Sequence, residues 1–109
     1  MTYGLGHELK HAVINASASG DNTLVTAVAG QRIKVVSYVC IAANAVNATF
    51  KSGASTSISG ALTLGTNSGV SCPNNCESVL MQTAVGEGLV LNLSGNVLVG
   101  GHLSYIAEA

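Results

Sequence analysis

The sequence predicts an all-β fold, an antiparallel, jelly-roll-like β-sandwich of about eight strands. Three observations lead to this prediction. Apolar and polar residues alternate in several short runs, which is the period of a half-buried strand. Turns rich in glycine, asparagine and serine separate these runs at intervals of roughly 8 to 12 residues. No segment shows the spacing of an amphipathic helix.

The clearest strand pattern lies near the C-terminus. Leu89, Leu91 and Leu93 alternate with Val90 and Asn92, so the three leucines share one face. We expect that face in the core and the opposite face on water or on a partner. On this basis Val90 is a candidate partner contact, and Val90→Asp is expected to spare the fold.

A second run follows at once, after a tight-turn composition at residues 94–96. Val97 and Val99 lead through the glycine pair Gly100-Gly101 to Leu103 and Tyr105. We expect a meander of neighbouring strands, with the glycine pair kinking the last of them.

Earlier strands are expected at residues 23–29, 31–43, 46–51 and 58–64, with a turn at 20–22. The longest has two expected faces: Ile33, Val35, Val39 and Ile41 on one, and Arg32, Lys34, Val36, Tyr38 and Cys40 on the other. Arg32 and Lys34 are either a basic spot facing a partner or two solvated strand charges.

The totals indicate one domain, with residues 1–6 as an N-terminal arm and residues 7–109 as a single β-sandwich. Charged residues make up 8% of the chain, against about 25% in ordinary domains. The net charge of −1 provides no basic footprint for nucleic acid, and no apolar run is long enough to span a membrane. A surface with so few charged residues suits a protein that is packed against copies of itself or against a larger assembly.

The N-terminus lacks the pattern of a signal peptide, so synthesis in a cytoplasm is expected. Cys72 and Cys76 flank the turn Pro73-Asn74-Asn75. They are candidates for free thiols, for a local disulfide or for half of a metal site, although structural zinc takes four ligands.

Motifs for catalysis are weak. The segment HELKH, from His7 to His11, has the spacing of a zinc protease, but its surroundings are strand-like, whereas that motif requires a helix. His102 is the one candidate for a third ligand. No nucleophile elbow is present and the five carboxylates are dispersed. We therefore expect no catalytic residue, no metal and no cofactor.

Three stretches carry a family resemblance: FKSG (50–53), ISGALTL (58–64) and TAVGEGLVLNLSGNVLVGGHLSY (83–105). They resemble small virion structural proteins of tailed bacteriophages, most closely capsid decoration, or cement, proteins. The segment from His11 to Val39 has a similar character.

The resemblance implies a non-enzymatic β-sandwich that binds the outside of a phage head and stabilises the shell. It implies the major capsid protein as partner, a dimer or trimer of the chain, and a place on the virion exterior after synthesis in the host cytoplasm. Related modules end tail fibres, so a receptor-binding module of a tail fibre or spike is the alternative. The cysteine pair departs from the family pattern.

Overall fold

A computed structural model describes residues 9–72 and 79–109 of the chain. The expected arm at residues 1–6 therefore lies outside the described residues. The described part contains strands and no helix. The ten strands are β1 (Lys10–Ala16), β2 (Gly20–Val25), β3 (Arg32–Ala42), β4 (Val46–Ser52), β5 (Thr56–Ser57), β6 (Leu62–Leu64), β7 (Ser68–Cys72), β8 (Met81–Gln82), β9 (Leu89–Leu93) and β10 (Val99–Glu108).

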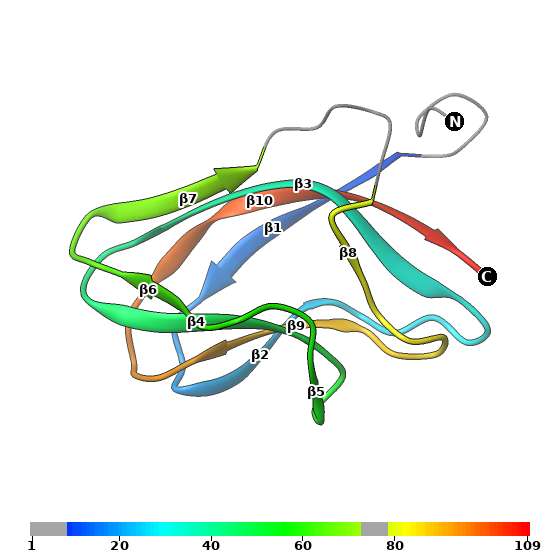
Figure 1. Cartoon of the computed structure of the whole chain (residues 1–109), viewed down its shortest axis with the longest axis horizontal. Coiled ribbons are helices and arrows are strands. Elements are labelled where there is room, and N and C mark those ends of the chain that lie inside the picture. Colours follow the sequence, from blue (N-terminus) through cyan, green and yellow to red (C-terminus); the bar gives the residue numbers. More distant parts are fainter. Residues whose placement is uncertain (1–8, 73–78) are drawn as a thin grey trace.

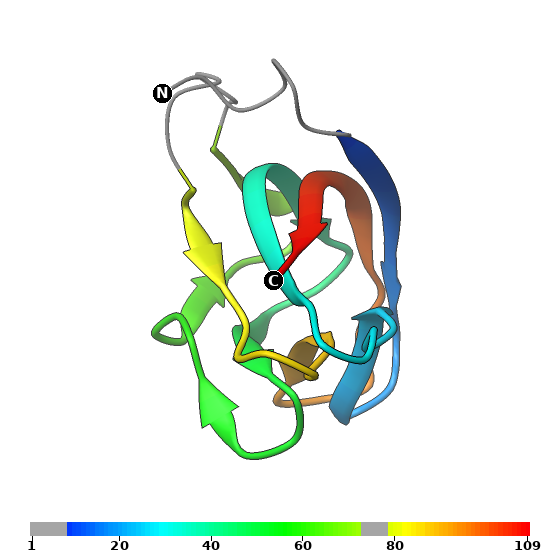
Figure 2. The same cartoon turned by 90° about the vertical axis from the view of Figure 1, so that its right-hand side faces the viewer.

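The strands form two five-stranded antiparallel sheets that pack face to face (Figures 1 and 2). The first sheet has the order β1-β10-β3-β7, and β8 also pairs with β3. The second has the order β2-β9-β4-β5, and β6 also pairs with β4. The prediction of an all-β antiparallel sandwich is confirmed.

The core lies between the two inner faces. The leucine face of β9 is fully covered, with Leu91 at 0% exposure, and the alternating residues Val46, Ala48 and Phe50 of β4 are buried beside it. The first sheet supplies Ile14, Val99 and Leu103 from the other side. These inner faces follow the period-2 pattern that the sequence predicted.

The expected meander is wrong, because β9 and β10 belong to different sheets. Their connection crosses the end of the sandwich instead of forming a hairpin. Ser94 fixes it on β4: its backbone N–H donates to the Asn47 carbonyl (3.0 Å) and its Oγ accepts from the Asn47 N–H (2.9 Å). The Asn96 Oδ1 accepts a third bond from the N–H of Ser19 (2.7 Å).

The predicted faces of β3 hold for only half of the strand. Ser37 pairs with Ser104 of β10, but Val35 pairs with the next residue, Tyr105, so Val36 is an extra, bulged residue. A bulge inverts the alternation beyond it. The residues that point inward are therefore Ile33 and Val35 before it, and Cys40 and Ala42 after it; Ile41 is exposed instead of buried.

Two strand boundaries also differ from the prediction. β2 begins at Gly20, so residues 20–22 belong to a strand and the turn lies before them. The Asn22 side chain fixes this turn, since its Nδ2 donates to the Ala18 carbonyl at 2.8 Å. The expected strand at 58–64 is reduced to Leu62–Leu64. The N–H groups of Ile58 and Ser59 both donate to the carbonyl of Phe50, so these two residues do not follow the regular pairing of a strand.

The glycine pair does not interrupt β10, which runs as one strand and keeps regular pairing through residues 100 and 101. Its pairing irregularity lies at Ser104/Tyr105 and faces the bulge of β3. Gly101 is needed for another reason: a Cβ at this position would overlap the carbonyl oxygen of Val39 on the neighbouring strand.

Candidate binding surfaces

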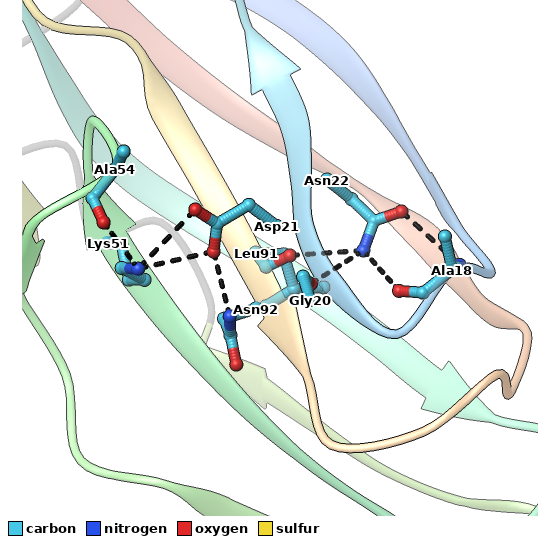
Figure 3. A network of polar contacts seen from close by, with 8 residues as sticks. All are labelled: Ala18, Gly20, Asp21, Asn22, Lys51, Ala54, Leu91 and Asn92. Carbon is cyan, nitrogen blue, oxygen red and sulfur yellow. Dashed lines mark hydrogen bonds and ion pairs between the residues drawn. The ribbon is translucent and has the colours of Figure 1, made fainter.

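The outer face of the second sheet carries a polar network around Asp21 (Figure 3). The Asp21 Oδ1 accepts hydrogen bonds from Asn92 Nδ2 (2.7 Å) and from Lys51 Nζ (3.2 Å). Lys51 also donates to the carbonyl of Ala54 at 2.7 Å. The Asn92 hydrogen bond, and after it Lys51, lowers the pKa of Asp21 below its ordinary value. Asp21 and Lys51 each therefore have a polar partner besides the other: Asn92 for the carboxylate and the Ala54 carbonyl for the ammonium group.

Next to this network lies a shallow hollow of about 390 Å³ lined by Asp21, Thr23, Thr26, Ala27, Gly53, Ala54, Gly88 and Val90. Val90 is only 7% exposed. It is flanked in register by Thr23 and Lys51, whose side chains rise on either side of it.

The candidate partner contact at Val90 is therefore largely covered by the chain itself. The expectation that Val90→Asp spares the fold does not fit this burial, since a carboxylate at a covered position is costly.

A different surface is apolar and open. The turn between β2 and β3 (residues 27–30) and the turn between β8 and β9 (residues 84–86) lie side by side at the lower right of Figure 1. The N–H of Gly86 donates to the carbonyl of Gln31 (2.7 Å), which joins them. We call residues 27–30 and 84–86 the apolar tip: it contains no charged residue, and its Val28 and Val85 are 43% and 49% exposed.

The sequence pattern does not reveal this tip, because it predicts a strand over residues 23–29, whereas β2 ends at Val25. The signal was present in the composition: valine and alanine occupy a turn, where polar residues are usual.

A buried polar network holds the tip on the sandwich. Thr83 is 1% exposed; its Oγ1 accepts from the Ile33 N–H (2.9 Å) and donates to the Glu87 carbonyl (2.9 Å). The Oγ of Ser52 donates to the Glu87 carboxylate (2.6 Å) and accepts from the Ala84 N–H (2.8 Å). Since Ile33 and Ser52 lie in different sheets, these bonds link both sheets to the second turn of the tip.

We expect Thr83→Val to lower the free energy of unfolding by about 1–3 kcal/mol, because the Ile33 N–H loses its acceptor in a buried place. Urea unfolding followed by circular dichroism measures the change. Thr63→Val on the exposed side of β6 is the matched control and is expected to change stability by less than about 0.5 kcal/mol. Equal losses in the two variants would contradict a structural role for the Thr83 hydroxyl.

The predicted basic spot at Arg32 and Lys34 is partly neutralised. Lys34 Nζ lies 2.6 Å from the Glu108 carboxylate, and both side chains are partly buried. Arg32 is opposite Glu108 in the register of β3 and β10. The arrangement resembles a paired surface charge more than a basic patch open to a partner.

Among the described residues, Cys40 and Cys72 form no disulfide with each other. Cys76 lies outside the described part, so the disulfide, thiol and metal alternatives for the Cys72–Cys76 pair stay open. Cys40 is fully buried, and this burial raises the pKa of its thiol. Burial, followed by the nearby thiols of Cys72 and Cys40, likewise raises the pKa of Tyr38.

The HELKH segment enters a strand, since Lys10 and His11 begin β1. His11 Nδ1 lies 3.0 Å from Ser104 Oγ of the paired strand. His7 and Glu8 are outside the described residues. Within residues 9–72 and 79–109, no three His, Cys, Asp or Glu side chains gather as a metal site would require, and no helix is long and apolar enough to cross a membrane.

These features define the chain as an all-β protein built from two packed antiparallel sheets. Comparison with protein-family models, with curated proteins and with solved structures finds no match.

Proposed function

We propose that this chain is a non-enzymatic capsid decoration protein that binds the outside of a phage head and stabilises the shell. The observation that carries the proposal is the apolar tip, where Val28 and Val85 are exposed to solvent on two turns joined by a hydrogen bond. Exposed apolar groups that cluster at one end of a domain mark a protein-binding site. The proposed partner is the major capsid protein, and the proposed location is the virion exterior.

The tip suits a passive binding role because it is presented on a fixed base. The Thr83 and Ser52 hydrogen bonds hold its second turn to both sheets, so little conformational entropy is lost when a partner covers it. A protein that binds the assembled shell and not the free capsid subunits stabilises the shell by mass action. Repeated identical sites on a lattice add avidity if the bound copies also contact one another.

The strand order agrees with the jelly-roll-like architecture that we propose. The first strand pairs with the last, since β1 lies beside β10, and the second pairs with the last but one, since β2 lies beside β9. A chain folded back on itself in this way brings the turns of the tip together from distant parts of the sequence.

Shell binding is tested by cosedimentation with heads assembled from the major capsid protein without this chain. Wild type is expected to saturate the heads at copy numbers comparable to the shell subunits. Val85→Asp is expected to bind at least about tenfold more weakly, because it places a carboxylate in an apolar contact, with its melting temperature nearly unchanged. Thr63→Asp, an exposed substitution on β6, is the control and should bind as wild type does.

Failure of the wild-type chain to bind such heads would overturn the proposal, as would full binding by Val85→Asp. The alternative, a receptor-binding module of a tail fibre or spike, is favoured by the hollow beside Asp21, whose volume falls in the usual range of roughly 300–1,000 Å³ for ligand sites. That alternative requires copies that purify with tails and not with heads.

A further inference from the structure

Two histidines lie on neighbouring strands of the first sheet, where β1 runs beside β10 (Figure 1). His11 of β1 lies opposite Ser104 of β10. Two residues along the same strand pair, Val13 lies opposite His102. Residues two apart in a strand share a face, so His11 and His102 lie on the same side of the sheet, one diagonal step apart. Leu103, between His102 and Ser104, belongs to the core, which places both exposed histidines on the outer face.

The separation of the two histidines suits a shared ligand. Diagonal neighbours on an antiparallel strand pair lie about 7–8 Å apart, within reach of long side chains. A cation held by two imidazoles lies about 2.0–2.1 Å from a nitrogen of each ring, so both rings can turn toward one point between His11 and His102. The residues at the other two corners, Val13 and Ser104, carry no charge that would repel a cation. Lys10, the nearest cationic residue along β1, alternates to the other face of the strand.

One of the two rings already has a partner that orients it. His11 Nδ1 lies 3.0 Å from Ser104 Oγ, and Ser104 is only 9% exposed. When Nδ1 donates its proton to this hydroxyl, Nε2 keeps the lone pair that a cation requires. Histidines that bind metals have such a partner on the second nitrogen, which fixes the tautomer and the orientation of the ring. The contact with Ser104 is therefore of the kind that prepares His11 to bind a metal.

We propose that His11 and His102 together bind a divalent transition cation such as Zn²⁺, Cu²⁺ or Ni²⁺, with water in the remaining coordination positions. Imidazole nitrogen suits these cations, whereas Mg²⁺ and Ca²⁺ take oxygen ligands. A closed structural zinc site takes four protein ligands, and residues 9–72 and 79–109 bring no three His, Cys, Asp or Glu side chains together.

Two protein ligands make an open and reversible site. Because the pair supplies half of the ligands of a structural zinc site, the dissociation constant for Zn²⁺ at neutral pH is expected to be about 1–200 μM. The site also differs from the zinc-protease spacing of the sequence, in which His11 would act with His7. It does not depend on binding to a phage head.

Titration of the full chain with zinc chloride, followed by NMR of the ¹⁵N-labelled imidazole nitrogens, tests the proposal, because each histidine is observed separately from the cysteine thiols. In wild type, Zn²⁺ should shift a ring nitrogen of His11 and one of His102 over the same range of concentration. Mg²⁺ at about 10 mM should shift neither. His102→Asn is expected to weaken Zn²⁺ binding at His11 by about tenfold or more, because a single imidazole lacks the second, tethered ligand. Both positions are exposed, so the fold should tolerate the change.

His7→Asn, which replaces the remaining histidine of the chain, is the matched control and should bind Zn²⁺ as wild type does. The absence of a shift at His11 and His102 up to about 1 mM Zn²⁺ would overturn the inference. Binding at His11 that survives in His102→Asn would overturn it as well, and its loss in His7→Asn would then assign the cation to the HELKH motif.

Discussion

Gly101→Ala is expected to lower the free energy of unfolding by about 2–4 kcal/mol. The added methyl group would overlap the carbonyl oxygen of Val39 and crowd the backbone of Cys40. Both belong to β3, the strand beside β10 in the first sheet, so relief requires these two strands to separate and their hydrogen bonds to weaken. Guanidinium unfolding followed by circular dichroism measures the loss.

The adjacent Gly100 provides the control within the same strand. A Cβ there meets open space, so Gly100→Ala is expected to change stability by less than about 1 kcal/mol, and the stiffer unfolded chain favours a gain. Similar losses in both variants would mean that alanine is unfavourable anywhere in this stretch of β10, and would contradict a specific effect of the close approach of Gly101 to Val39.

Leu91→Ala is expected to cost about 2–5 kcal/mol, because truncation leaves a cavity in a packed core. Leu91 is 0% exposed and lies at the centre of β9, between Asn22 of β2 and Phe50 of β4 in the sheet register. The core residues of the first sheet close over it. Thermal melting and urea unfolding at micromolar protein concentration measure the cost.

Leu98→Ala removes the same atoms from a half-exposed position and is the matched control, with an expected change within about 0.5 kcal/mol. A Leu91→Ala variant as stable as Leu98→Ala would contradict the assignment of the β9 leucines to the core.

The candidate site was predicted less well than the fold. Val90 was assigned to a partner because it alternates with the core leucines, yet Thr23 and Lys51 flank it and the chain itself covers it. The apolar tip escaped prediction because Val28 and Val85 are separated by more than fifty residues, and it is the fold that brings their turns together, as the Gly86–Gln31 hydrogen bond shows.

The features that could be predicted from the sequence are local ones. The alternation at residues 46–50 and 89–93 decides that these segments are strands and which side chains face the core, because the period of a strand is a property of a few neighbouring residues.

The remaining features depend on contacts between distant parts of the chain. The bulge at Val36 is set by pairing with β10, some seventy residues away, and it turns Ile41 outward. The crossing between β9 and β10 depends on the bonds of Ser94 to Asn47, and the need for glycine at residue 101 depends on the backbone of Val39. Contacts between distant residues decide which strands pair, in what register, and which outer faces are covered. The local period of a strand carries no information on these contacts.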